Sequence, residues 1–352
     1  MLASDFDFHL PEELIAQEAL PRGASRLLVL DRASGAVEHT HVTELPRLLG
    51  AGDLLVVNNT RVFAARLLGR RVPSGGAVEC LLLRRLAAAP GGGETWEALM
   101  HPGQKLKAGA RVRFEGAAGA IEGTVLARRF HGRRTIALAA EGGRPLDDLV
   151  DALGHVPLPP YIRRTDTTAD RERYQTVFAA ARGSVAAPTA GLHFDRQMLR
   201  VLADAGVGRA EITLHVGYGT FKPLRSEIVE EHVVDPEDYE ISDDTATAVT
   251  AARQAGRRVV AVGTTTTRAL EDAAMKHGGE VRPGRGEATA FIYPGFEFRV
   301  ITGLMTNFHL PKSSLLMLVA AFAGREQVMA AYREAVERRY RFYSYGDAML
   351  IL

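Results

Sequence analysis

Cysteine is almost absent from this 352-residue sequence, in which Cys80 stands alone. A single thiol forms neither an internal disulfide nor a zinc site of several cysteines, so the composition fits a reducing compartment and argues against metallothiolate chemistry. Long apolar runs are missing too. No stretch approaches the ~18 apolar residues of a membrane span, and the N-terminus lacks the basic and then apolar start of a signal peptide. We therefore expect a cytoplasmic protein.

The sequence also lacks an excess of charge of either sign, since 43 Lys and Arg stand against 42 Asp and Glu. An apolar share of 46% and a charged share of 24% are ordinary for a globular protein, and they exclude disorder, collagen and coiled coil. At ~100–200 residues per domain, the length allows two domains or one large domain with an insertion.

Common short signatures of catalysis are absent as well. The sequence contains no H-E-x-x-H, C-x-x-C or G-x-S-x-G, which argues against zincin, thiol-redox and α/β-hydrolase chemistry. Neither the G-x-G-x-x-G fingerprint nor the phosphate-loop motif occurs, so nucleotide binding of those two types is not expected.

Residues 66–150 differ from the rest of the chain in charge and in pattern. They hold 14 Lys and Arg against 8 Asp and Glu, while the remainder holds 29 against 34. Short runs of strand-forming residues alternate here with Gly-rich turns, which is typical of a small antiparallel sheet or barrel. The runs are 78–83, 95–99, 111–114, 120–125 and 135–138. We predict an inserted basic all-β domain over 66–150.

The flanking segments, 1–65 and 151–352, alternate between strand and helix patterns, which predicts an α/β fold class and one main catalytic domain. Helices are expected to begin after the caps Asp195 and Ser242. Strands are expected at 53–57, 211–216, 258–262, 288–293 and 297–301, and apolar helices at 314–323 and 326–339.

Six polar clusters follow strands or apolar runs, where α/β folds expose reactive groups. They are 58–61, 188–194, 215–221, 263–268, 306–313 and 343–349. Each has a structural alternative: the first fits a turn, the glycines of the third fit a β-bulge, and the last fits a packed tail.

Three histidines lie in these clusters, His193, His215 and His309. A single histidine at such a position can equally be a helix cap or a core residue. The three are more than ~20 residues apart, so they would meet at a metal only through folding, and we expect no metal.

In this order, the clusters resemble the S-adenosylmethionine:tRNA ribosyltransferase-isomerase family of queuosine biosynthesis. Several long blocks in one order are more specific than a single short motif. Thr266 and Thr267 depart from the family pattern, which has serine and then a small or β-branched residue before Arg268. The similar blocks are 4–16, 53–61, 174–178, 188–194, 214–221, 232–233, 306–313 and 341–349.

The resemblance implies a barrel-like α/β main domain split by a smaller β-barrel insertion. It also implies the reaction: the ribosyl part of S-adenosylmethionine is moved onto 7-aminomethyl-7-deazaguanine at the tRNA wobble position and isomerised, giving epoxyqueuosine, while adenine and methionine leave. S-adenosylmethionine is then a consumed co-substrate, and no tightly bound cofactor is expected.

Such a site must remove a proton from the ribose 5′ carbon beside the sulfonium, protonate departing adenine and accept a base from the anticodon stack. His193, His215 and His309 are the candidates for proton exchange. Asp347 would orient one of them or pair with the sulfonium. Which histidine is base and which is acid stays open.

Other side chains of the clusters would bind the substrates. Amides and hydroxyls suit ribose, guanidinium groups suit a carboxylate or phosphate, and aromatic rings suit stacking on a base. The predicted substrate-binding set is Asn58, Asn59, Thr60, Arg61, Thr189, Gly191, Tyr218, Gly219, Phe221, Gly263, Thr264, Thr265, Arg268, Asn307, Lys312 and Tyr345.

The insert carries two arginine doublets, which flank a predicted hairpin turn at 131–132. We predict that Arg128, Arg129, Arg133 and Arg134 contact tRNA phosphates, with a solvated hairpin tip as the structural alternative.

Two other functions compete with this one. An RNA-binding module without catalysis would explain the basic insert but not the many polar clusters at strand ends. A methyltransferase would use S-adenosylmethionine too, but its usual Gly-rich turn after the first strand is missing. The oligomeric state is left open.

Overall fold

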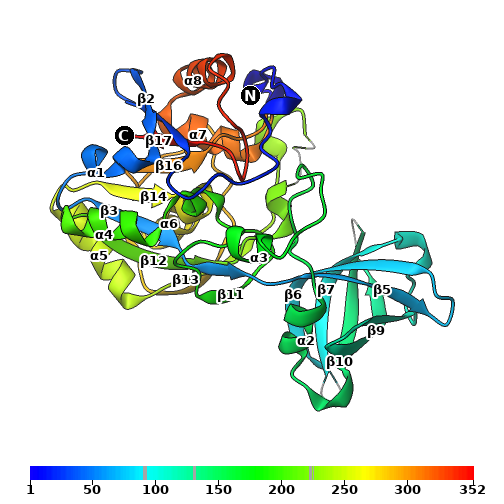
Figure 1. Cartoon of the computed structure of the whole chain (residues 1–352). Coiled ribbons are helices and arrows are strands. Elements are labelled where there is room, and N and C mark those ends of the chain that lie inside the picture. Colours follow the sequence, from blue (N-terminus) through cyan, green and yellow to red (C-terminus); the bar gives the residue numbers. More distant parts are fainter. Residues whose placement is uncertain (90–92, 130–131, 222–223, 225) are drawn as a thin grey trace.

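The computed structural model describes residues 1–89, 93–129, 132–221, 224 and 226–352. Its main strands form two bodies that are distinct in Figure 1, a nine-stranded sheet with helices around it and a closed six-stranded β-barrel. A parallel pair, β4 (Thr60–Val62) and β11 (Ala181–Ser184), completes the strands.

The nine-stranded sheet is mixed, and its central strands are parallel. β12, β3, β14 and β16 are neighbours that all run in one direction. In spatial order the strands are β15 (Gly284–Ala288), β13 (Glu237–Ile241), β12 (Gly208–Leu214), β3 (Leu54–Asn58), β14 (Val259–Val262), β16 (Gly303–Asn307), β17 (Ala348–Ile351), β1 (Arg26–Leu30) and β2 (Val37–His41).

Strand β3 shows why the central strands read as continuous apolar runs. Leu54 and Val56 point into the core on one face of the sheet, whereas Leu55 and Val57 point into the core on the other. A parallel strand covered on both faces has no side that needs polar residues.

Helices pack on both faces of this sheet (Figure 1). The two predicted caps are confirmed, because the Asp195 side chain accepts from Met198 N and the Ser242 side chain accepts from Thr245 N. The helices are α1 (Leu45–Leu48), α2 (Leu146–Leu153), α3 (Asp170–Arg173), α4 (Arg196–Asp204), α5 (Asp243–Gln254), α6 (Thr264–Lys276), α7 (Ser314–Ala323) and α8 (Arg325–Glu337).

The barrel contains all five strand-forming runs predicted between 78 and 138, and the sequence pattern missed its first strand, β5. Its apolar interior includes Trp96, Phe114 and Ile136. In spatial order the strands are β10 (Arg133–Ala140), β7 (Gly93–His101), β6 (Ala77–Ala89), β5 (Arg66–Val72), β8 (Arg111–Gly116) and β9 (Gly119–Arg128).

The larger sheet is open, with β15 and β2 at its ends, whereas the resemblance implies a barrel-like main domain. Both end strands carry exposed charged side chains, as at Arg285, Glu287 and Glu38. Such charges are typical of solvent-facing edges, and they oppose the edge-to-edge pairing that would close the sheet.

The strands predicted at 288–293 and 297–301 do not form, apart from Ala288 at the end of β15. The N–H groups of Arg299, Val300 and Ile301 instead donate to the buried carboxylate of Glu271 over 2.8–3.0 Å. A side chain therefore satisfies the backbone donors that a neighbouring strand would otherwise bind.

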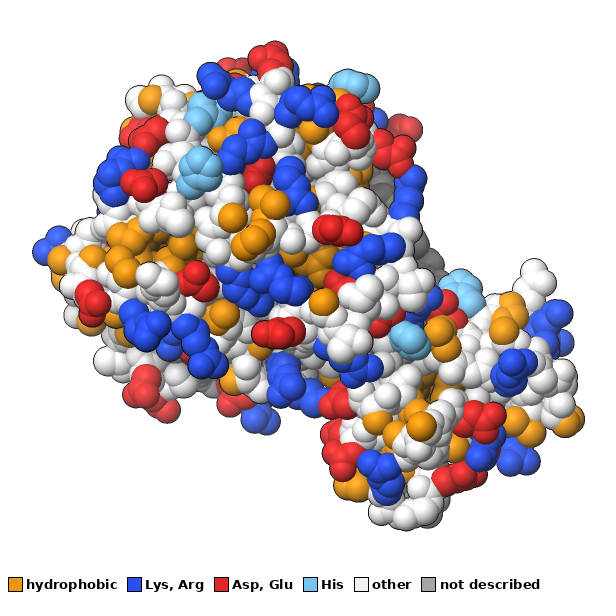
Figure 2. Space-filling view, in the orientation of Figure 1, with side chains coloured by type: hydrophobic (Ala, Val, Ile, Leu, Met, Phe, Trp, Pro, Cys, Tyr) orange, Lys and Arg blue, Asp and Glu red, His pale blue; other side chains and the backbone are white. Residues whose placement is uncertain are grey.

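Ion pairs join the barrel to the sheet body. Arg133 of β10 pairs with Asp235 at 2.8 Å, and Arg182 of β11 pairs with Asp147 of α2 at 2.9 Å. The Arg182 guanidinium also lies over the Phe63 ring, 4.6 Å from its centroid. The junction between the two bodies is visible in Figure 2, where basic and acidic side chains intermingle on both.

Among the described residues, no single helix is long and apolar enough to cross a membrane; α7 and α8 reach that length and composition only as a pair, bent by 117°.

The prediction for the fold concerns Arg134, which the structure places inside the barrel rather than at a solvated tip. Its guanidinium donates to the carbonyls of Leu106, Arg133 and Gly103 over 3.0, 2.9 and 2.6 Å. Arg134→Ala should lower the free energy of unfolding by about 3 kcal/mol, because three carbonyls, of which that of Leu106 is buried, lose charge-assisted bonds. Urea unfolding followed by the fluorescence of Trp96, the single tryptophan, measures it. The exposed neighbour Arg129→Ala is the control, and equal stability of both variants contradicts the prediction.

Candidate active site

Four of the six polar clusters meet at one edge of the large sheet. They follow β12, β3, β14 and β16, and the carboxyl ends of parallel neighbours lie side by side. A fifth cluster forms the short helix η8 (Thr189–His193), which packs against β16. Ligands of open α/β sheets bind at this edge.

A small pocket lies between these loops, with an interior of about 50 Å³. The predicted clusters supply much of its lining, including residues of the C-terminal cluster 343–349, and the loop after Pro160 adds Tyr161. The polar lining residues are Thr189, Thr264, Thr265, Thr306, Asn307, His309, Tyr161, Tyr343 and Ser344, with Gly263 beside them.

The N-terminus of α6 borders this pocket. Gly263 caps the helix with φ at +93°, a conformation that favours glycine. The hydroxyls of Thr266 and Thr267 donate back to carbonyls of the preceding turn, whereas Thr264 and Thr265 line the pocket. Because the first N–H groups of a helix lack partners within it, this end suits an anionic or oxygen-rich ligand.

His309 lies in the pocket wall at the end of β16. Its Nε2 is 2.8 Å from Thr306 Oγ1, and its backbone N–H donates to the Tyr332 hydroxyl. Burial lowers the pKa of His309 to about 3. The ring is therefore neutral near pH 7, and burial disfavours its protonated form.

His193 lies behind the pocket lining, on η8. Its Nδ1 is 3.0 Å from Ser25 Oγ, whereas Nε2 is buried without a hydrogen-bond partner among the described residues. Burial lowers the pKa of His193 to about 4, although the Asp347 charge and the Asn307 amide favour the protonated ring. The Oδ1 atom of Asn307 is also buried and unpaired in the described chain. Unpaired buried polar atoms are costly, and these two belong to side chains that interact, since the Asn307 amide raises the pKa of His193.

His215 belongs to a different cleft, between the sheet and the barrel. Its Nδ1 is 2.8 Å from Thr60 Oγ1, and its ring lies against Gly183, where a Cβ atom would come within 2.6 Å of it. Burial lowers the pKa of His215, against the opposing charges of Asp238 and Glu240. The three histidines thus divide into a pair near Asn307 and a separate His215.

Asp347 is buried beneath this region and bound to its own chain. It accepts from the guanidinium of Arg26 at 3.0 Å and from the backbone N–H groups of Arg26 and Arg341. The carboxylate therefore fixes the start of β17 and acts on His193 through its charge, without lining the pocket.

The amides after β3 hold the sheet edge together. Asn58 bonds both backbone groups of Leu214, so it joins the ends of β3 and β12. Asn59 accepts from the Thr213 hydroxyl at 2.7 Å and donates to Glu211. Neither amide lines the small pocket, and Arg61 is exposed on β4.

Three further residues of the predicted substrate-binding set have protein partners. Arg268 forms a buried ion pair with Glu237 at 2.5 Å, Lys312 pairs with Asp7 at 2.6 Å, and the Tyr345 hydroxyl donates to Asp170 at 3.1 Å. Gly191 is buried, and a Cβ there would come within 2.8 Å of Phe178 and Thr176. Tyr218 and Gly219 line the cleft of His215, and the side chain of Phe221 lies outside the described residues.

The four arginines predicted to contact tRNA differ in exposure. Arg128 and Arg129 are exposed at the end of β9, whereas Arg133 is paired with Glu97 and Asp235. Arg134 is buried, so the predicted role does not fit it: its guanidinium faces carbonyls of its own barrel rather than solvent. Of the predicted turn at 131–132, residue 131 lies outside the described residues.

One side of the pocket is aromatic, and of its two rings Tyr343 lies in the predicted cluster 343–349 whereas Tyr161 was not predicted. The Tyr161 and Tyr343 rings are 3.8 Å apart between centroids, and the Tyr161 hydroxyl bonds Ser344. The available signal was the Pro-rich stretch 157–161 near a tyrosine, which predicts a loop but not its contact with the C-terminal segment.

The described residues contain no group of three His, Cys, Asp or Glu side chains placed to hold a metal ion.

Comparison with known proteins places this architecture in a family. The family profile described as "Queuosine biosynthesis protein" matches residues 3–351, and the chain belongs to this family. It is 51% identical to the S-adenosylmethionine:tRNA ribosyltransferase-isomerase of Symbiobacterium thermophilum, over all of both chains. It is also 51% identical to the protein of that name from an Anaeromyxobacter species, over all of this chain and 99% of the other. The crystal structure of a Thermotoga maritima S-adenosylmethionine tRNA ribosyltransferase is similar with a TM-score of 0.54 and 38% identity, over 99% of this chain and all of that one.

The lowered pKa of His309 should make the stability of the protein depend on pH. An unfolded chain protonates this imidazole below about pH 6.5, while the folded chain does so only near pH 3, so acidification favours unfolding across that window. His309→Gln should remove about 3 kcal/mol of the stability loss between pH 7 and pH 4. Urea unfolding at both pH values tests this, with the exposed His277→Gln as control. An unchanged pH dependence in His309→Gln contradicts it.

Proposed function

We propose that this chain is an S-adenosylmethionine:tRNA ribosyltransferase-isomerase. It transfers the ribosyl group of S-adenosylmethionine onto 7-aminomethyl-7-deazaguanine at the tRNA wobble position and isomerises it, which gives epoxyqueuosine and releases adenine and methionine. This proposal is supported by the 51% identity with a protein of that name over the full length of both chains, and by a pocket that is built from the same sequence blocks.

His309 is the proposed acceptor of the proton from the ribose 5′ carbon, because it lines the pocket and is unprotonated at pH 7. A pKa of about 3 makes the buried ring a weak base, so this role requires the loaded site to raise that pKa. His193 is the second proton carrier, placed behind Asn307 and near the charge of Asp347. The departing adenine needs a proton donor. A histidine that has accepted a proton earlier in the reaction would be that donor.

The start of α6 is the proposed subsite for the polar groups of S-adenosylmethionine. Its free N–H groups favour the methionine carboxylate, while Thr189, Thr264 and Thr265 offer hydroxyls to ribose. Ligand pockets usually enclose about 300–1,000 Å³. A cavity of about 50 Å³ must therefore open to admit the substrate, and Tyr161 and Tyr343 are the side chains that would move.

We also propose how the co-substrate is used, where the enzyme works and how its domains are arranged. S-adenosylmethionine acts as a consumed co-substrate without a metal or bound cofactor, and the enzyme works in the cytoplasm. Residues 66–150 are one domain, inserted into a main domain of 1–65 and 151–352.

Product analysis tests the function. The protein is incubated with labelled S-adenosylmethionine and tRNA carrying the deazaguanine precursor, with and without a chelator. Release of adenine and methionine supports ribosyl transfer, S-adenosylhomocysteine indicates methylation, and neither product indicates binding alone. Magnesium is restored as a control because it also folds tRNA.

The proton-transfer roles predict the behaviour of two alanine variants. His309→Ala and His193→Ala should each lower turnover by about 10²–10⁴, the usual loss for a missing acid or base. Steady-state turnover is measured with both substrates saturating, and circular dichroism verifies folding. Wild-type turnover in either variant removes that histidine from the mechanism.

We expect the exposed arginines Arg128 and Arg129 to contact tRNA phosphates. The double change Arg128→Glu and Arg129→Glu should raise the KM for tRNA and lower the salt slope of binding by somewhat under one unit per lost contact. The KM for S-adenosylmethionine should stay unchanged. Arg282→Glu with Arg285→Glu, exposed on the sheet body, matches the charge change as a control. If both doubles behave alike, the barrel arginines have no specific role.

A further inference from the structure

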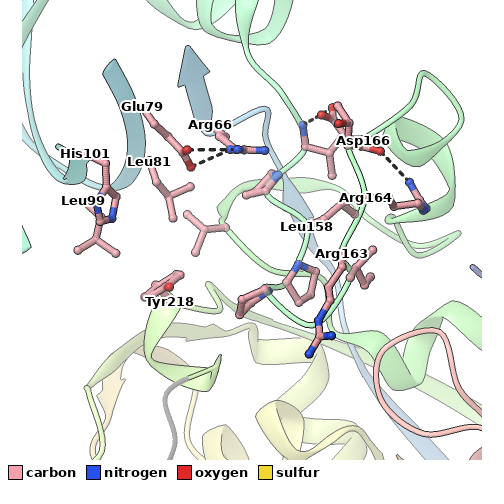
Figure 3. A pocket seen from close by; sticks show the side chains of 17 residues that line it. Arg66, Glu79, Leu81, Leu99, His101, Leu158, Arg163, Arg164, Asp166 and Tyr218 are labelled. Carbon is pink, nitrogen blue, oxygen red and sulfur yellow. Dashed lines mark hydrogen bonds and ion pairs between the residues drawn. The ribbon is translucent and has the colours of Figure 1, made fainter. Parts of the chain in front are cut away.

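A second pocket, larger than the first, lies between the barrel and the loop of residues 156–166 (Figure 3). Its volume is about 550 Å³. Strands β5, β6 and β7 form one wall, and Tyr218 closes another side. This volume is within the range of pockets that hold a nucleotide-sized ligand.

Leucines and prolines line this pocket together with several charged side chains. Leu81 and Leu99 face the cavity from the barrel, and Leu158 faces it from the loop, among prolines. At the rim, Arg66 and Glu79 form a bidentate pair at 2.8 and 3.2 Å. Leucine side chains and an aromatic ring suit the faces of a nucleobase, and the Arg66–Glu79 pair borders the place where its edge would lie.

Arg163 adds a cation that can exchange its partner. Its side chain is 73% exposed, and its ion pair with Glu12, itself 69% exposed, joins two solvated groups. Such surface pairs contribute little stability, so a phosphate can replace the carboxylate at small cost. S-adenosylmethionine has no phosphate and carries a positive sulfonium, so this rim suits a nucleic acid better than that co-substrate.

The two pockets lie on either side of one loop. Tyr161 lines the small pocket, while its neighbours Pro160 and Ile162 line the larger one. Tyr218 lines the larger pocket and also the cleft that holds His215. One single-stranded RNA segment can therefore reach both pockets.

We propose that the larger pocket receives an unstacked nucleotide of tRNA that directly flanks the wobble nucleotide. The base lies between Tyr218 and the leucine walls, and the adjoining phosphate lies on Arg163. This proposal rests on tRNA being the substrate, as argued above, and adds a second base to the one that reacts. The enzyme would thereby select the sequence or flexibility of the anticodon loop.

To test this, a bulky side chain is introduced into the pocket, either from the loop or from the barrel. Leu158→Trp and Leu99→Trp are compared with Leu126→Trp, an exposed leucine on β9 that does not line the pocket. Affinity is measured by fluorescence anisotropy for anticodon stem–loops that carry the deazaguanine, either intact or with an abasic site 5′ or 3′ to it. Both pocket variants should weaken the intact stem–loop about tenfold or more, the usual worth of one stacked base. One of the two abasic stem–loops lacks the base that the pocket receives. Wild type and pocket variants should bind that stem–loop with equal affinity.

Three outcomes overturn the proposal. One is an equal loss for intact and both abasic stem–loops. Another is unchanged affinity of both pocket variants for the intact stem–loop. The third is weakened binding of S-adenosylmethionine alone, measured by equilibrium dialysis, which would assign the pocket to the co-substrate. The test measures RNA affinity and does not depend on catalysis. A wild-type protein that releases no adenine would contradict the proposed function, while the comparison of affinities would still decide whether the pocket receives a base.

Discussion

The parallel pairing of β12, β3, β14 and β16 is the constraint on which the rest of the structure depends. Four neighbouring strands that run the same way must end at the same edge, so chain segments far apart in sequence meet there. Asn58 reinforces this edge because its amide bonds both backbone groups of Leu214 at the end of β12. The apolar character of the strands follows from their burial on both faces, so polar side chains gather at the strand ends and in the segments that follow them.

Burial at that edge sets the chemistry of the histidines. His309 and His193 have pKa values of about 3 and 4, because desolvation disfavours the charged imidazolium. Both rings are therefore neutral at physiological pH, and the same lowering of the pKa makes each of them a weaker base. The same burial makes the site costly to maintain, since His193 Nε2 and Asn307 Oδ1 are unpaired among the described residues.

The barrel meets the sheet body at a junction of ion pairs, and a pocket lies beside it. Arg133 and Arg182 join the two bodies by ion pairs at their surfaces, and the pocket of Leu81, Leu99 and Leu158 lies between barrel and loop. Arg134, by contrast, supports the barrel itself from within.

The sequence alone determined the local features of this protein. The caps Asp195 and Ser242, the runs of the barrel strands and the apolar run of β3 all follow from short-range preferences and periodicity, and the long blocks identify the family. Tertiary structure alone decided which polar residues face a cavity. Asn58, Arg268 and Arg134 look like ligand-binding groups in the sequence, yet each has its hydrogen-bonding capacity taken up by a distant segment. Tyr343 lies in a predicted cluster, whereas Tyr161 gave no such signal. The two rings meet at the pocket because a loop and the C-terminal segment pack together across 182 positions of sequence. Hydrogen-bond partners and burial depend on contacts between remote segments, and these contacts exist only once the chain has folded.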